Sequence, residues 1–151
     1  MCIRDSACDE TQGKALDASA IARPANPVTD NAPDMVAVPL VALAWGRSGD
    51  KGSKANIGII ARQPQYLPYI WAALSEQIVT ERFAHFLEDT AAGNVERFLL
   101  PGANAINFLL HDVLGGGGVA SIRNDPQGKG YAQLLLSTPV PVPAAIAETL
   151  Q

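Results

Sequence analysis

The stretch that decides the fold is ALAWGRSGDKGSKANIGIIA, residues 42–61. Apolar runs open and close it, and the residues between them are mostly charged, hydroxyl-bearing or glycine. Two apolar runs rich in β-branched and aromatic residues, separated by polar sequence with glycine, are typical of an antiparallel pair of strands. We therefore predict a strand over residues 36–46, a polar loop, and a second strand over residues 57–61. Gly58 within the second strand indicates close approach of another backbone.

Helical spacing of apolar residues begins after this pair. The pattern over residues 66–78 predicts a helix, and its phase changes after Thr80, which could serve as an N-cap. We expect two helical segments or one kinked helix, followed by a third strand over residues 95–100. Residues 103–113 then carry apolar side chains at helical spacing and predict another helix that ends at four consecutive glycines.

The C-terminal part predicts one more strand and one more helix. Residues 119–122 form the fourth expected strand, and Asp125 with Pro126 suits the N-cap and first position of a helix that ends near Ser137. The segment 139–143 alternates proline with valine and cannot be a central strand. This order predicts an α+β fold with an open four-stranded sheet and helices packed mainly on one face.

Length and composition favour one folded domain. The chain has 151 residues, of which 48% are hydrophobic, and is too short for two ordinary domains. Residues 1–35 have few large apolar side chains and should form a disordered head or linker, whereas residues 36–143 form the domain and residues 144–151 a C-terminal tail. Proline-containing residues 22–33 resemble an interdomain linker, which suggests a larger upstream domain.

Charge and cysteine content exclude several classes of function. The chain has a formal net charge of −4, and residues 36–143 carry equal numbers of basic and acidic side chains. Nucleic acid is therefore not an expected partner. Both cysteines, Cys2 and Cys8, lie in the head, so we expect neither a disulfide framework nor a metal site. No stretch is apolar enough for a membrane span, and a cytoplasmic location is expected.

The polar loop of the opening stretch is the main candidate site. Its glycines could orient backbone N–H groups toward an anion, and its cationic side chains could add charge toward a carboxylate or phosphate. Both glycine-rich phosphate-binding patterns are nevertheless absent, since Lys51 precedes Gly52 and a strand follows. Ligand or partner binding and an ordinary solvated loop remain alternatives. The candidate binding residues are Arg47, Ser48, Gly49, Asp50, Lys51, Gly52 and Asn56.

A second candidate region includes the glycines Gly115, Gly116, Gly117 and Gly118. They exceed what a helix C-cap requires, and they could allow close approach of a ligand or of a neighbouring helix. On the preceding predicted helix, Asn104, Phe108 and His111 share the side opposite Ile106 and Leu110. His111 is the weak candidate for proton transfer, and a surface or helix-end role is the alternative.

Four segments of the sequence resemble a known family. They are residues 43–52, residues 55–58, residues 107–114 with the glycines that follow, and residues 125–129. Together they resemble the C-terminal ferredoxin-fold domain of the AtuA family, over about residues 38–143. The resemblance implies a ferredoxin-like fold and a part in bacterial utilisation of acyclic terpenes such as citronellol and geraniol. It also implies a larger AtuA-type N-terminal domain as partner, in cis or in trans. It assigns no catalytic residue, and the cofactor stays unknown.

Three hypotheses about function follow. The first is an accessory or binding module of a protein that catabolises terpenes or acyl compounds, whose polar loop faces a small anionic ligand or a partner domain. The second is a small hydratase or lyase that acts on a CoA-linked acid, with His111 as acid and base. The third is a structural module that forms a homo-oligomer or an interdomain surface.

Overall fold

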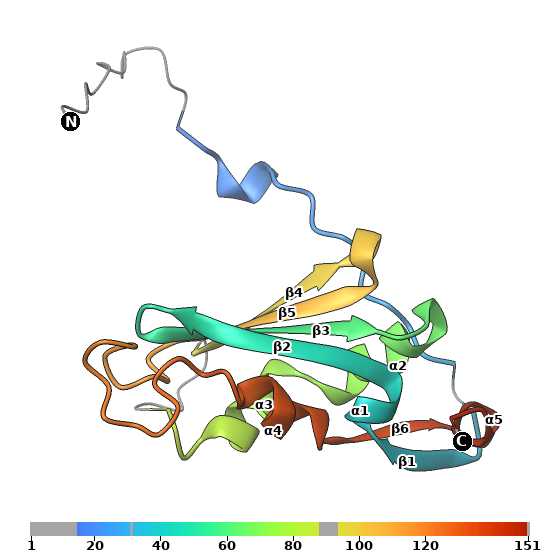
Figure 1. Ribbon diagram of the computed structural model, residues 1–151. Helices are drawn as coiled ribbons and strands as arrows, with labels where there is room; N and C mark the ends of the chain where they lie inside the picture. The colour runs from blue at the N-terminus through green and yellow to red at the C-terminus, as the bar shows by residue number, and fades with distance from the viewer. Residues whose placement is uncertain (1–14, 31, 88–93, 151) are drawn as a thin grey trace, which may run out of the picture.

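A four-stranded antiparallel sheet forms the centre of the molecule in the computed structural model, which describes residues 15–30, 32–87 and 94–150 (Figure 1). The strands follow the order β2-β3-β5-β4, and each neighbouring pair is antiparallel. Their bounds are β2 Ala44–Lys51, β3 Lys54–Ala61, β4 Val95–Leu100 and β5 Ala105–Leu110.

The first two strands form the predicted antiparallel pair, but the stretch between their apolar runs is not a loop. Strand β2 continues to Lys51 and β3 starts at Lys54, which leaves Gly52 and Ser53 as the turn. Gly52 has a φ of 66°, as a two-residue hairpin turn commonly requires. Polar residues here extend the ladder because strands with one open face tolerate polar side chains on that face.

The predicted first strand, residues 36–46, is divided in two. Strand β1 (Met35–Pro39) ends where the short helix α1 (Leu40–Leu43) begins, and β2 follows directly. β1 pairs with β6 (Pro139–Pro143) in a separate two-stranded sheet. The expectation that the proline-rich segment is not a central strand is thus confirmed, and its prolines alternate with the buried Val140 and Val142.

Two helical segments follow β3, as expected, but the break between them lies at Leu74 and Ser75 and not after residue 78. The 3-10 helix η3 (Pro64–Tyr66) leads into α2 (Leu67–Ala73), and α3 spans Glu76–Phe83. The predicted N-cap was wrong. Ser75 Oγ accepts the N–H of Ile78 at the start of α3, whereas Thr80 lies within the helix and donates its hydroxyl to the carbonyl of Glu76 at 2.8 Å.

The predicted helix over residues 103–113 is strand β5, preceded by the 3-10 helix η4 (Pro101–Ala103). Ile106, Phe108 and Leu110 are each 0% exposed and share one face, which is the period of a strand. The expected strand at residues 119–122 is also wrong. Val119 and Ile122 are fully exposed, and no described strand pairs with them.

The last helices differ from expectation at their bounds. Helix α4 spans Tyr131–Leu136 and begins after the predicted cap at Asp125. The Asp125 carboxylate instead accepts the N–H groups of Lys129 and Gly130, at 2.9 and 2.7 Å, in the turn before the helix. Beyond residue 143 the chain continues as α5 (Ala144–Glu148), and Ile146 packs against the core. A 3-10 helix, η2 (Ala18–Ala20), is formed in the N-terminal segment.

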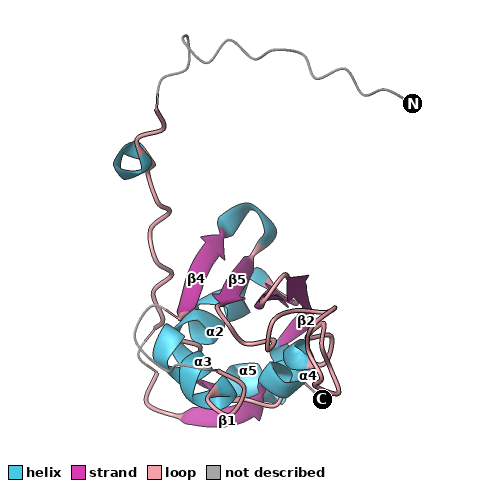
Figure 2. Cartoon of the chain, turned by 90° about the vertical axis from the view of Figure 1, so that its left-hand side faces the viewer, coloured by secondary structure: helices cyan, strands magenta, loops and turns pink. Residues whose placement is uncertain are grey.

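The helices cover one face of the sheet, as predicted. Figures 1 and 2 show α2, α3 and α4 on the same side, with β1 beyond them. The side chains between these layers form the core, and among the largest that are fully buried are Ile57, Ile59, Phe83, Ile106, Phe108, Leu110 and Tyr131. No described helix covers the opposite face, which we call the open face.

The topology is ferredoxin-like. Because β5 is antiparallel to both β3 and β4, the crossover through α2 and α3 joins two parallel strands with β5 between them, a split βαβ unit. The strand that completes the sheet beside β3 is β2, which precedes this unit in the sequence. After β5 and α4 the chain does not return to this sheet, and β6 pairs with β1 instead.

Candidate functional site

Alternation along β2 divides the predicted binding residues between the two faces of the sheet. Arg47, Gly49 and Lys51 belong to the open face, since their partners across β3 are Gly58, Asn56 and Lys54. Ser48 and Asp50 belong to the helix-covered face, because they pair with the buried Ile57 and Ala55. The backbone here is part of a strand ladder, so the expected concave cradle of N–H groups is not formed. Any positive charge at this site comes from side chains.

Ser48 has a structural role that the sequence did not reveal. Its side chain is buried, its hydroxyl donates to the carbonyl of Lys129 at 3.0 Å, and it accepts the N–H of Ala132 at 2.9 Å. These two bonds join β2 to the first turn of α4. Both hydrogen-bonding functions of the hydroxyl are therefore used inside the fold.

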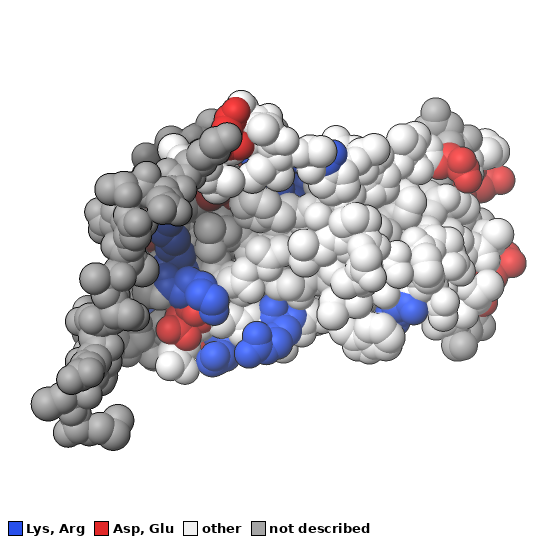
Figure 3. Space-filling model, turned by 90° about the horizontal axis from the view of Figure 1, so that it is seen from above, with Lys and Arg blue, Asp and Glu red and all other residues white. Residues whose placement is uncertain are grey.

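The open face carries a cluster of basic side chains near the β2–β3 turn. Arg47, Lys51 and Lys54 come from the hairpin, and Lys129 reaches it from the turn before α4, with its Nζ 3.2 Å from where a Cβ on Gly49 would lie. Within the described residues no carboxylate lies within 4.0 Å of these four side chains. Figure 3, which views the molecule from above, shows basic residues gathered toward one end, with acidic atoms among them.

Asn56 and the neighbouring Asn107 make a polar pair in the middle of the open face. Asn56 Nδ2 donates to Asn107 Oδ1 at 2.6 Å. Asn107 lies opposite Gly58, which in turn lies opposite Arg47. The expected close backbone approach at Gly58 is wrong, since a Cβ there would meet only the carbonyl oxygen of Arg47, at 3.8 Å.

His111 follows β5 directly and forms a pair with Glu96 of β4. Its Nε2 lies 2.6 Å from Glu96 Oε1, and the two side chains are 23% and 44% exposed. The pair is at the same end of the sheet as the basic cluster, because residue 110 pairs with Ala55 next to Lys54. A carboxylate bonded to one imidazole nitrogen orients the ring and leaves the other nitrogen for a second partner.

Asn104 is not part of this group. It lies at the other end of β5 with a φ of 48°, in the connection after η4, and its carbonyl accepts the N–H of Ala61 at 3.0 Å. The six residues of β5 separate Asn104 from His111 by roughly 20 Å. Phe108, expected beside both, is 0% exposed in the core.

The four glycines pack against the β2–β3 turn. Gly115, Gly116 and Gly117 have φ values of 60°, 92° and 88°, which explains why glycine occupies these positions. A Cβ on Gly117 would lie 2.7 Å from the carbonyl oxygen of Gly52, and the N–H groups of Val113 and Leu114 donate to the carbonyl of Ser53. Gly118 shows no such constraint. The glycines were expected to allow close approach of a ligand or of another part of the chain, and at Gly117 it is the backbone of the β2–β3 turn that lies close.

The other end of the open face is apolar. Trp45, Ile60 and Leu100 are 53%, 46% and 47% exposed, and they occupy one row across the sheet with Ala105. Arg62 stacks on the Trp45 ring, 4.8 Å from its centroid. Sequence reasoning assigned Trp45 and Ile60 to apolar strands without distinguishing their face. Counting alternate positions outward from Ile57 and Ile59 would have separated them.

Arg97 is a largely buried cation beside a pocket, with its side chain 13% exposed. Its guanidinium lies 3.6 Å from the centroid of Trp71, its Nη1 donates to the carbonyls of Trp71 and Leu74, and its Nη2 is 3.9 Å from Glu76. Burial lowers the pKa of Arg97, and the Glu76 carboxylate opposes that shift. These contacts tie the end of α2 to β4. A pocket of about 570 Å³ adjoins it, bordered by residues 21–24 and 26 of the N-terminal segment.

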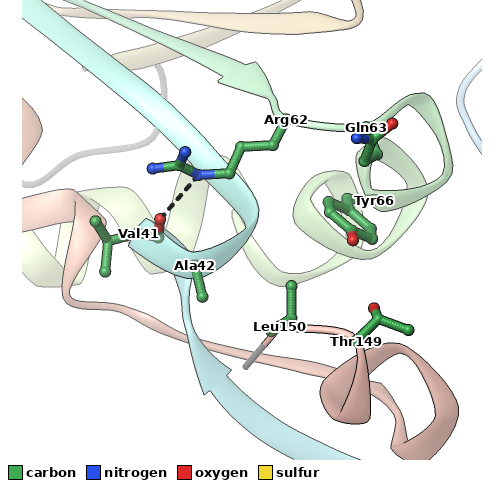
Figure 4. A pocket seen from close by; sticks show the side chains of 7 residues that line it. All are labelled: Val41, Ala42, Arg62, Gln63, Tyr66, Thr149 and Leu150. Atoms are coloured by element: carbon green, nitrogen blue, oxygen red, sulfur yellow. Dashed lines mark hydrogen bonds between the residues drawn. The ribbon is translucent and has the colours of Figure 1, made fainter.

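A further pocket, of about 380 Å³, contains none of the predicted site residues (Figure 4). Arg62 borders it and donates from Nε to the carbonyl of Val41 at 3.2 Å. Its other lining residues are Ala42, Gln63, Tyr66, Thr149 and Leu150. Arg62 is the one charged side chain among the residues that line this pocket.

Within the described part of the chain, no group of three or more histidine, cysteine, aspartate or glutamate side chains could hold a metal ion. None of the helices in that part is long and apolar enough to span a bilayer.

Comparison with known proteins identifies the family. The family model of the AtuA ferredoxin-like domain matches residues 38–141. This range includes all four strands of the central sheet and the glycines at residues 115–118. No curated protein and no solved structure matches the chain. The matched region is more than half of the sequence and agrees with the split βαβ topology. The chain therefore belongs to the AtuA ferredoxin-like domain family.

Proposed function

We propose that the chain is an accessory binding module that docks onto a partner domain through the open face of its sheet. The observation that carries this proposal is the row of exposed apolar side chains at one end of that face, with Trp45 at 53% exposure. Exposed apolar groups that lie together and are bordered by polar residues mark protein–protein contacts. Tryptophan is also among the residues that most often dominate binding energy at such contacts.

The partner in this proposal is a larger AtuA-type N-terminal domain, either upstream in the same polypeptide or in a separate chain. Membership of the AtuA ferredoxin-like domain family supports the proposal, because the resemblance of the sequence to that family implies such a partner. The complete protein would take part in bacterial catabolism of acyclic terpenes or related acyl compounds, in the cytoplasm. Residues 36–143 would be the module, and residues 1–35 its linker.

The test uses a substitution at the centre of the apolar row. Trp45→Asp should weaken the complex with a purified AtuA-type N-terminal domain at least about tenfold, because loss of an aromatic anchor at an interface commonly costs 2 kcal/mol or more. Titration calorimetry or light scattering of the mixture measures the affinity. Ile78→Asp is the matched control, since Ile78 is 40% exposed on helix α3, away from the open face.

The alternatives give different outcomes. If the chain alone has the mass of a dimer, and Trp45→Asp converts it to a monomer, the open face is a homo-oligomer surface. Equal affinities of Trp45→Asp, Ile78→Asp and the unchanged chain for the partner would contradict docking through this face.

A second candidate function is acid–base catalysis by the His111–Glu96 pair. The 2.6 Å contact between the two side chains is the observation that favours it. If the chain hydrates an unsaturated CoA-linked acid or catalyses the reverse elimination, His111→Ala should lower the rate by about 10² to 10⁴. Glu96→Gln, which preserves the shape of the orienting group, should lower it less. A rate unchanged by His111→Ala would remove His111 from the chemistry.

A further inference from the structure

We propose that the open face binds a phosphate group over Gly49 and Gly58, at a position we call the glycine platform. The two glycines lie diagonally across β2 and β3, because Gly49 pairs with Asn56 and Gly58 pairs with Arg47. Neither carries a side chain that would rise from the sheet. Over Gly58 only the carbonyl oxygen of Arg47 lies within 4 Å of where a Cβ would be.

Four cationic side chains surround the platform. Arg47 and Lys51 stand two residues to either side of Gly49 on the same face, about 7 Å along the strand, and Lys54 lies opposite Lys51. Lys129 approaches Gly49 from the turn before α4, with its Nζ 3.2 Å from the position of a Cβ. Lys129 thus reaches Gly49 from a separate segment, whereas the Lys51 ammonium donates to the carbonyl of Asp50 at 2.9 Å.

The charge balance at the platform favours a bound anion. In the described part of the chain no carboxylate lies within 4.0 Å of these four cations, although the whole chain has a net charge of −4. Asp50 lies between Gly49 and Lys51 in β2, and the Asp125 carboxylate accepts the backbone N–H of Lys129, but neither carboxylate forms an ion pair with a cation of this cluster. Like charges placed together repel one another, and a ligand of opposite sign removes that cost.

The asparagine pair adds a neutral donor to the platform. Asn107 accepts from Asn56 through its Oδ1, which leaves Asn107 Nδ2 free to donate in the row that contains Gly58 and Arg47. The site therefore combines a forked guanidinium, lysine ammonium groups and an amide. Arginine binds phosphate oxygens in pairs, and lysines act as point charges that suit a group with more than one negative charge.

The number of cations distinguishes phosphate from a carboxylate. A single carboxylate has one negative charge and two oxygens, and it would leave most of the four cations uncompensated. A phosphate has up to two negative charges and oxygens directed to several sides. The free ion and the phosphate of a nucleotide-like ligand present the same chemistry to this site, and the exposed Trp45 on the same strand distinguishes them in the test.

The experiment measures binding of inorganic phosphate, pyrophosphate and ADP to the full chain by calorimetry at constant ionic strength. We expect pyrophosphate to bind, and Lys51→Ala with Lys54→Ala to weaken binding at least about tenfold, since each charge-assisted contact contributes more than a neutral one. Arg62→Ala is the matched control for Lys51→Ala alone, because each variant removes one positive charge and Arg62 lies beside Trp45 at the apolar end. Tighter binding of ADP than of pyrophosphate, accompanied by quenching of tryptophan fluorescence that is absent in Trp45→Asp, would identify a nucleotide-like ligand.

The most specific variant is Gly58→Val, which fills the platform without removing any charge. Its φ is not in the left-handed region, the space above it is open, and β-branched residues suit a strand, so the variant should fold. We expect it to reduce phosphate binding at least tenfold while the thermal midpoint stays within a few degrees. Should it fail to fold, the double lysine variant decides the question.

Three results would overturn the proposal. They are absence of pyrophosphate binding by the unchanged chain, equal binding by the double lysine variant, and equally tight binding of citrate. The site does not depend on the docking proposal, because binding is measured without a partner and Trp45→Asp should retain affinity for pyrophosphate. Failure of one proposal therefore leaves the other open to its own measurement.

Discussion

Replacing Phe108 with alanine should lower the free energy of unfolding by about 3–5 kcal/mol, the largest effect expected of any single core substitution described here. Phe108 is 0% exposed in the middle of β5, between Ile57 of β3 and Arg97 of β4. Removing the ring takes away buried apolar surface and leaves a cavity between the sheet and the helices, because the surrounding packed side chains relax only partly. Urea denaturation followed by circular dichroism measures the change.

Leu109→Ala is the control for this prediction. Leu109 is the next residue in β5 and belongs to the open face, where it is only partly buried. Its truncation should cost clearly less, on the order of 1 kcal/mol, since less surface is lost and no enclosed cavity forms. If the two substitutions had equal effects, the alternation of faces along β5 would be wrong and the helical interpretation of residues 103–113 would return.

Gly117→Ala should destabilise the protein by at least about 1–3 kcal/mol, the cost of holding a non-glycine residue in a sparsely populated conformation. Gly117 has a φ of 88°. An added Cβ would lie 2.7 Å from the carbonyl oxygen and 2.9 Å from the carbonyl carbon of Gly52, and both atoms belong to backbone that cannot move aside without opening the hairpin turn. The steric overlap adds to the conformational cost.

The same substitution should affect the glycine platform. The turn that Gly117 contacts joins Lys51 to Lys54, so a displaced turn moves two of the four cations, and affinity for pyrophosphate should fall together with stability. Gly118→Ala is the control, because its φ is not positive and the nearest atom to an added Cβ is Gln127 Cγ at 3.5 Å. That variant should stay within about 0.5 kcal/mol of the parent. Equal stability of the two variants would contradict the packing role of Gly117.

Much of the fold could be predicted from local sequence. The antiparallel pair around the hairpin, the two helical segments, strand β4 and the peripheral position of the proline-rich segment all follow from apolar periodicity and from proline geometry. These elements have one dominant period or a residue that excludes alternatives. The α+β class with helices on one face followed from their order.

The prediction for residues 103–113 failed because that segment fits two periods. Ile106, Leu109, Leu110 and Val113 have helical spacing, whereas Ile106, Phe108 and Leu110 alternate as in a strand. Tertiary pairing decided between them, since β3 and β4 each present a free edge that β5 fills. Because β5 is the remaining strand of the four-stranded sheet, residues 119–122 have no place in it, and Val119 and Ile122 are exposed.

The candidate site shows the same division. The composition of residues 46–56, rich in glycine and in charge, was sufficient to single out the hairpin. It did not show that Ser48 bonds within the core while Arg47 and Lys51 face outward, because that depends on which face the helices cover. Lys129, Asn107 and Glu96 come from distant segments, and only the folded sheet brings them to the same face.

The hairpin at residues 44–61 depends on both local sequence and tertiary packing. Local sequence indicated an antiparallel pair of strands and the family, because strand propensity and local motifs act over a few residues. It did not indicate that both strands continue through the polar residues to a two-residue turn at Gly52 and Ser53. Only the tertiary structure decided which face is open, since helices separated from the hairpin in sequence bury one side of it. The cations at one end of that face and the tryptophan at the other are therefore exposed together because the helices pack against the opposite face.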